Sequence, residues 1–253
     1  MKKDNEYDIA SQQLANWVIK YTCLIININP KTSKKEAIAT GTLVRYKGRN
    51  LIISAGHTFT QGNFNDLYVY TDEGSVKLSG MLYTSWLFVE KGSLTKDLDY
   101  GYIILDDFTY ERLLKKYEFL PETHLKVNHH PEKLQNYVAF GFPYRKTKIE
   151  QKRHGDIYAS SLFIHTVDPG DYRYKNGFNK NEHIVVAYNK LRIISTQLKG
   201  TAPNLQGMSG GGLWLLTKDE HFSTGIRLVG ILIEFDTESI YATKIDNIVK
   251  HLH

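Results

Sequence analysis

The hydrophobic residues of this chain fall in short runs separated by polar turns, a pattern typical of β-strands. One series of runs precedes residue 107, and a second follows residue 134. We therefore expect an all-β fold of two antiparallel β-barrels, each with about six strands. The expected strands are 21–28, 37–45, 50–54, 66–70, 75–78, 82–89 and 100–105, then 136–142, 156–167, 183–188, 191–196, 211–216, 227–235 and 239–245.

Three segments have helical instead of alternating spacing. Residues 8–20 place Leu14, Trp17 and Val18 on one face, residues 108–119 are charged and followed by Pro121, and residues 245–252 again have one apolar face. We expect a short helix at each end of a single unit. Its predicted parts are an N-terminal helical extension (1–20), a first barrel (21–107), an interbarrel linker (108–133) and a second barrel with a C-terminal helix (134–253).

Composition narrows the class of protein. The chain has 253 residues, of which 42% are hydrophobic and 23% charged, so it can form one large globular domain or two small ones. A net charge of +5 permits an anionic partner without requiring one, and no aromatic-basic nucleic-acid motif appears. The single cysteine, Cys23, excludes an intramolecular disulfide. No secretion signal or membrane-length apolar run is visible, so we expect a cytoplasmic protein with no membrane contact, no metal and no cofactor.

The segment 205–214 places a serine inside a cluster of glycines. Gly207 and Gly210 flank Ser209, and glycine adopts backbone angles that other residues avoid. Such a turn can expose a nucleophilic hydroxyl and aim backbone N–H groups at a developing oxyanion. Glycine-serine clusters are also ordinary surface turns, so this segment needs a base and an acid elsewhere in the chain before it indicates chemistry.

A candidate base and a candidate acid lie in the first barrel. His57 ends a buried-looking strand, where it is either a base or a structural histidine. Asp99 precedes the apolar run 100–105, and Asp97 lies two residues earlier. Strand alternation puts both carboxylates on the same side, so periodicity does not separate them.

Six motifs appear in a characteristic order: 39–45 (ATGTLVR), 53–57 (ISAGH), 99–104 (DYGYII), 207–211 (GMSGG), 229–232 (VGIL) and 240–243 (IYAT). With them, the sequence resembles the trypsin-like serine peptidases of the chymotrypsin fold, of the disulfide-free bacterial and viral type. The resemblance spans roughly residues 20–252. It also favours Asp99 over Asp97, because the family has a small residue two positions after its acid, where Gly101 stands.

The resemblance implies a regulated intracellular serine endopeptidase that acts either on polypeptides in general or on one specific intracellular protein. Ser209 would attack the scissile carbonyl, His57 would accept its proton, and Asp99 would orient the imidazole. The N–H groups of Gly207 and Ser209 would form the oxyanion hole. The alternative is a catalytically silent protein of the same fold that serves as a protein-binding module.

Two departures from the family pattern affect these expectations. Met208 replaces the aspartate that binds a new N-terminus in zymogen-type members, so activation must be built in or come from another source. The substrate pocket is also unusual, because Phe235 replaces a glycine and should narrow the entrance, while Glu234 faces either a basic substrate side chain or water. By position, the expected pocket residues are Pro203, Gln206, Ile233, Glu234, Phe235 and Ser239.

Overall fold

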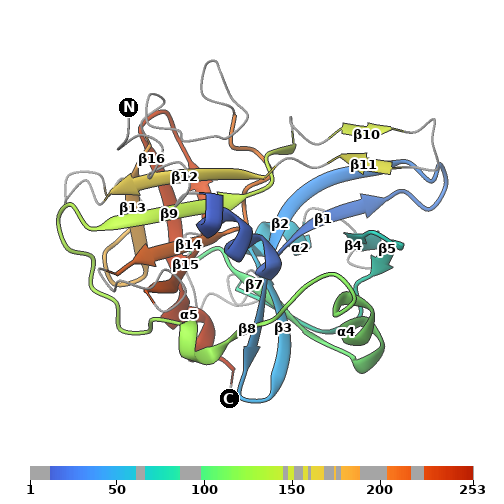
Figure 1. Cartoon of the computed structure of the whole chain (residues 1–253), viewed down its shortest axis with the longest axis horizontal. Coiled ribbons are helices and arrows are strands. Elements are labelled where there is room, and N and C mark those ends of the chain that lie inside the picture. The colour runs from blue at the N-terminus through green and yellow to red at the C-terminus, as the bar shows by residue number, and fades with distance from the viewer. Residues whose placement is uncertain are drawn as a thin grey trace.

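The first half of the chain forms a curled antiparallel sheet (Figure 1). The computed structural model describes residues 12–60, 66–85, 98–144, 148–150, 156–158, 161–167, 174, 178–188, 204–217 and 225–252. Strand order in this sheet is β5-β4-β1-β2-β3-β7-β6. The bounds are β1 (Thr22–Ile28), β2 (Lys35–Tyr46), β3 (Arg49–Ser54), β4 (Leu67–Thr71), β5 (Gly74–Lys77), β6 (Gly80–Thr84) and β7 (Gly101–Leu105).

The second half forms a six-stranded antiparallel sheet in the order β12-β9-β14-β15-β16-β13. Its strands are β9 (Asn136–Gly141), β12 (Leu162–Val167), β13 (His183–Ala187), β14 (Gly212–Leu216), β15 (Ile226–Phe235) and β16 (Ser239–Lys244), with β10 (Lys148–Glu150) and β11 (Asp156–Tyr158) paired separately. The two curled sheets confirm the predicted all-β, two-barrel fold. The first has more strands than expected, because β8 (Leu120–Pro121) also joins it, parallel to β2. The expected strand 191–196 lies outside the described residues.

Side-chain burial explains why these segments form strands. In β4, Leu67, Val69 and Thr71 are buried while Tyr68 and Tyr70 are only half-buried, which is the period of two expected for a strand with one face on the core. β15 differs, since six consecutive residues from Leu228 to Ile233 are buried. It packs on the barrel core with one face and on the interface between the barrels with the other.

Helices are few and short. Residues 12–18 are helical and continue into η1 (Ile19–Tyr21), which agrees with the predicted N-terminal helix within the described residues. The C-terminal helix is α5 (Ile245–Val249), and its predicted apolar face is buried. The remaining helical elements are α2 (Gly56–Thr60), α4 (Asp107–Leu113) and η3 (Glu122–His124). No helix in the described part of the chain is long and apolar enough to cross a membrane.

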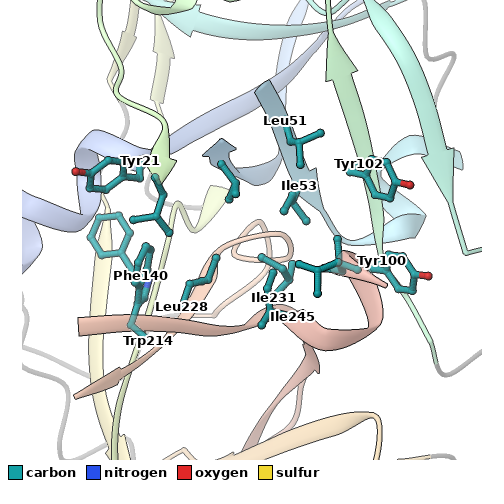
Figure 2. Packing of buried hydrophobic residues seen from close by; sticks show 14 of the residues in the cluster. Tyr21, Leu51, Ile53, Tyr100, Tyr102, Phe140, Trp214, Leu228, Ile231 and Ile245 are labelled. Atoms are coloured by element: carbon teal, nitrogen blue, oxygen red, sulfur yellow. The ribbon is translucent and has the colours of Figure 1, made fainter. Parts of the chain in front are cut away.

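Large apolar side chains from both barrels meet between the two sheets (Figure 2). Leu51 and Ile53 of β3 face Phe140 of β9 and Trp214 of β14, and all four are at most 1% exposed. Ile245 of α5 joins the same cluster. Each barrel has its own core besides this one. Because apolar burial is the main force that drives association, this interface holds the two barrels in a fixed relative position.

We predict that the thiol of Cys23 is inert in the folded protein. Cys23 lies on β1 in the first barrel core, fully buried beside Gly41, and burial raises the pKa of its thiol to about 12. The reactive thiolate is therefore scarce at neutral pH as well as shielded. Iodoacetamide at pH 8 should leave the native protein unmodified and alkylate it once in denaturant, as measured by intact mass. Rapid alkylation under native conditions would contradict this placement.

Candidate active site

His57 is placed by a tight contact between α2 and β7. The chain leaves β3 at Ser54 and turns at once into α2, which carries His57 in its first turn. Phe59 of the same helix lies against Gly101, where an added Cβ would be 2.6 Å from the phenylalanine ring. Glycine at 101 thus allows α2 to approach the start of β7 closely. This approach is the physical reason for a small residue two positions after Asp99.

Asp99 holds His57 by two hydrogen bonds. Its Oδ1 accepts the backbone N–H of His57 at 2.8 Å, and its Oδ2 lies 2.5 Å from Nδ1 of the ring. Both side chains are largely, but not fully, buried, with 25% exposed for His57 and 13% for Asp99. The contact therefore retains access to solvent and to a ligand. Asp97, the competing acid, lies outside the described residues.

This pairing determines the chemistry open to the imidazole. An ionised carboxylate has only acceptor atoms, so the proton of a neutral ring must sit on Nδ1, facing Asp99. Nε2 then carries the free lone pair and is the atom able to accept a proton. The second hydrogen bond, from the backbone, fixes the carboxylate relative to the main chain of α2. His57 is thus oriented as a general base.

Ser209 is the second residue of the later of two consecutive β-turns, 205–208 and 208–211. The Met208 N–H donates to the Leu205 carbonyl and the Gly211 N–H to the Met208 carbonyl, each at 2.9 Å. The third residue of the first turn is Gly207 and that of the second is Gly210, with φ of 95° and 89°. Type II turns require positive φ at this position, where glycine is strongly preferred. The glycine spacing therefore follows from the turns that carry the serine.

Two of the four interior residues of these turns have a backbone N–H without an acceptor within the described residues. They are Gly207 and Ser209, the two donors expected from the sequence, whereas the N–H of Gly210 donates to the Leu232 carbonyl at 2.7 Å. Gly207 and Ser209 are each an interior residue of a β-turn. The hydrogen bond that closes a β-turn joins its first and fourth residues, so it does not use the N–H of an interior residue. Both donors are thus available to an incoming oxyanion.

The hydroxyl of Ser209 donates to the Ile233 carbonyl of β15 at 3.3 Å. This distance is longer than the usual 2.5–3.0 Å of an O–H···O bond, so the interaction is weak. Among the hydrogen bonds of the described residues, none joins Ser209 to His57. The structure thus brings His57 and Asp99 into contact and leaves the hydroxyl directed at β15.

A small pocket lies beside Ser209, with a volume of about 10 Å³, roughly the room for one water molecule. Three of the expected pocket residues line it, namely Ile233, Glu234 and Phe235. Four further residues that the sequence did not indicate also line it: Leu205, Met208, Leu232 and Ile240. Their only signal in the sequence is apolar character, which they share with every core residue.

The other expected pocket residues lie elsewhere. Gln206 is exposed, and its side-chain oxygen accepts a hydrogen bond from the Tyr144 hydroxyl at 2.9 Å. Ser239 is fully buried at the start of β16 and does not line the pocket. Pro203 lies outside the described residues. Glu234 is exposed, so its carboxylate has access to water even though the residue borders the pocket.

In the described part of the chain, no cluster of three or more His, Cys, Asp or Glu side chains is arranged to hold a metal ion. The described residues instead supply a serine on a glycine turn, backbone N–H donors beside it, and a histidine-carboxylate pair in the first barrel. This set is suited to acyl transfer by a serine nucleophile.

The glycine turn gives a stability prediction with a matched control. A Cβ at Gly210 would overlap the Thr40 carbonyl oxygen and the Ser54 hydroxyl, whereas one at Gly48 would meet nothing within 4 Å. Both glycines have positive φ. Gly48→Ala should therefore cost only the backbone strain, about 1–2 kcal/mol, and Gly210→Ala clearly more. Urea unfolding followed by tryptophan fluorescence measures both, and equal losses would contradict the close packing at Gly210.

Comparisons with known proteins come from structure alone, since no protein-family model and no curated protein matches the chain. The fold is similar to that of an inactivated protease paralogue from the scabies mite, S-I1, with a TM-score of 0.54 and 13% identity over 93% of each chain. It is also similar to the active form of the Rv3671c protease of M. tuberculosis, with a TM-score of 0.50 and 12% identity over 94% of this chain and 82% of that one. The chain therefore has the double-barrel fold of the chymotrypsin-like proteases.

Proposed function

We propose that the protein is a serine endopeptidase in which Ser209, His57 and Asp99 form the catalytic triad. The observation that supports this most directly is the double hydrogen bond by which Asp99 holds the backbone and the ring of His57. A structural histidine does not need its tautomer fixed by a carboxylate, whereas a general base does. The double turn around Ser209, with its free N–H groups, supports the same function.

In the first step, Oγ of Ser209 bonds to the carbonyl carbon of the scissile peptide while its proton passes to Nε2 of His57. The carbonyl oxygen gains the negative charge and accepts hydrogen bonds from the N–H groups of Gly207 and Ser209. Asp99 stabilises the imidazolium that forms. Before this step, the serine hydroxyl must leave the Ile233 carbonyl, which is inexpensive because that bond is long.

In the second step, the C–N bond breaks and His57 gives its proton to the leaving amine. An acyl-enzyme ester on Ser209 remains. Water then attacks the ester while His57 accepts its proton. The bond between the carbonyl carbon and Oγ breaks, His57 returns the proton to Oγ, and release of the carboxylic acid restores the enzyme. No group outside these residues, the substrate and water is required.

We propose that the substrate is a polypeptide with a small apolar residue on the acyl side of the cleaved bond. The pocket beside Ser209 has room for about one water molecule, and its walls are the side chains of Leu205, Met208, Leu232 and Phe235 together with their neighbours. Apolar walls offer no hydrogen bond to a polar side chain, and the small volume excludes a large one. The single cysteine fits a reducing compartment, and we propose a cytoplasmic substrate.

A fluorophosphonate probe tests the triad directly, because it reacts only with an activated serine. The wild type should be labelled and Ser209→Ala should not. Asp99→Asn should lower peptide hydrolysis by about 10⁴-fold, since the amide favours the wrong tautomer of His57. Asp107→Asn is the matched control, because Asp107 is exposed on α4, and it should retain the wild-type rate. A wild type that resists labelling under all conditions would exclude the proposed function.

The pocket gives a specificity prediction. Phe235→Gly removes the largest side chain that lines it and should extend cleavage from Ala-sized residues to Leu and Phe, as profiled with a peptide library. Glu234→Ala is the control, since the exposed carboxylate does not fill the pocket, and the size preference should be unchanged. A wild type that already prefers large residues would refute the proposed substrate class.

One observation favours the alternative of a catalytically silent binding module. The hydroxyl of Ser209 is bonded to the Ile233 carbonyl and not to His57. In addition, one structural neighbour is an inactivated protease paralogue by its description. The two functions differ in turnover. A partner captured from cell lysate by Ser209→Ala and then cleaved by the wild type identifies an enzyme, and a partner that stays intact identifies a binding module.

A further inference from the structure

Thr40 of β2 reaches from the first barrel to the turn that carries Ser209. β2 pairs with β1 at this position, but its pairing with β3 begins only at Thr42. One edge of β2 is therefore unpaired at Thr40, and the double turn of the second barrel occupies it. Thr40 is fully buried there, although more than 160 residues of sequence separate it from Ser209.

Every polar group of Thr40 has a hydrogen-bond partner. Its N–H donates to the Ser209 carbonyl at 2.9 Å. Its hydroxyl donates to the Gly207 carbonyl at 2.8 Å and accepts the N–H of Phe142 at 2.9 Å. Its own carbonyl accepts the Ser54 hydroxyl at 2.8 Å. The hydroxyl oxygen accepts the N–H of Phe142 on one side, so its single proton is left to point at the Gly207 carbonyl on the other. The Thr40 side chain therefore has one stable orientation.

These bonds complete a set that fixes every peptide group of the turn. The carbonyl of Gln206 accepts the N–H of Tyr144 at 2.8 Å, and the carbonyl of Met208 accepts that of Gly211 at 2.9 Å. Thr40 holds the two carbonyls that remain between residues 206 and 209. The C=O and N–H of a trans peptide point in opposite directions, so a fixed carbonyl also fixes the N–H of the next residue. The Gln206 bond thus sets the N–H of Gly207, and the Met208 bond sets that of Ser209.

The two bonds from Thr40 restrain the 207–208 and 209–210 peptide groups, which lie between and after the N–H groups of Gly207 and Ser209. Glycine permits a peptide to flip, because it tolerates both signs of φ, and Gly207 is the residue where a flip costs least. A flip at the 207–208 peptide would break both the bond from the Thr40 hydroxyl to the Gly207 carbonyl and the bond from the Met208 N–H to the Leu205 carbonyl, and would leave these polar groups without their partners. Such groups are costly to bury unpaired.

We infer that Thr40 is a positioning residue that keeps the oxyanion-binding turn in its working conformation, an inference that rests on the proposed peptidase function. Thr40 touches no reacting atom. It acts through the carbonyls of Gly207 and Ser209, and so couples the first barrel, which carries His57 and Asp99, to the donors of the second. Activation is in this way built into the docking of the barrels.

The test compares Thr40→Ser, which keeps the hydroxyl, with Thr40→Ala, which removes it. Both side chains are smaller than threonine and fit the site. Thr40→Ala should lower kcat by about 10–100-fold with KM within about twofold, because the lost alignment matters in the transition state and not in substrate binding. Thr40→Ser should stay within about threefold of the wild type. Rates are read with a peptide substrate below the unfolding temperature of each variant.

Thr42→Ala is the matched control, since Thr42 lies on the same strand, is equally buried, and donates to the Gly210 carbonyl at 3.0 Å. Thr42→Ala should lower the unfolding temperature by about as much as Thr40→Ala does. Its kcat should fall by less than about threefold, because the N–H of Gly210 is already bonded and is not a donor to the oxyanion. Equal kcat values for Thr40→Ala and Thr40→Ser, or equal losses in Thr40→Ala and Thr42→Ala, would overturn the inference. A wild type without fluorophosphonate reactivity would instead exclude the proposed function itself, and the inference with it.

Discussion

The turn that carries Ser209 lies against β2 of the first barrel with no space for a side chain at Gly210. A Cβ there would overlap the Thr40 carbonyl and the Ser54 hydroxyl. This contact requires the two barrels to dock in one register, since a shift along β2 would break the hydrogen bonds from Thr40 to the carbonyls of Gly207 and Ser209. The site depends on this register because His57 and Ser209 come from different barrels.

The apolar interface between the barrels maintains that register. Trp214 and Phe140 of the second barrel are fully buried in the same apolar cluster as Leu51 and Ile53 of the first. A large-to-small substitution in such a core costs about 2–5 kcal/mol, which is a large share of the stability of a typical domain. The same burial that stabilises the fold therefore also fixes the barrel that carries His57 relative to the barrel that carries Ser209. Stability and site geometry are not independent in this architecture.

Much of the fold could be predicted from the sequence, because alternation of apolar residues and helical spacing are local signals. β4 and α5 follow their patterns closely. The order of the motifs was also enough to select Ser209, His57 and Asp99 as candidates. The structure shows Asp99 in contact with His57, whereas strand periodicity alone does not distinguish Asp99 from Asp97, since both acids fall on the same side of a strand.

The rest of the site could not be predicted, because its residues carry no local signal. Leu232 and Ile240 line the pocket, but in the sequence they are two apolar strand residues among many. Gln206 and Ser239 were expected in the pocket by position, and their side chains lie elsewhere for reasons of hydrogen bonding and burial. Thr40 is a small polar residue in a strand, and only its partners, distant in sequence, distinguish it from Thr42.

Met208 shows how the turn is stabilised without charge. It is 2% exposed and lies in the apolar core of the second barrel. The aspartate that the zymogen-type peptidases have at this position would be a buried carboxylate, which is costly unless a cation pairs with it. This chain instead secures the turn by an apolar anchor and by neutral hydrogen bonds from Thr40 and Tyr144. These bonds join neutral groups that do not titrate, so holding the turn in this way requires neither a buried charge nor a cation to pair with it.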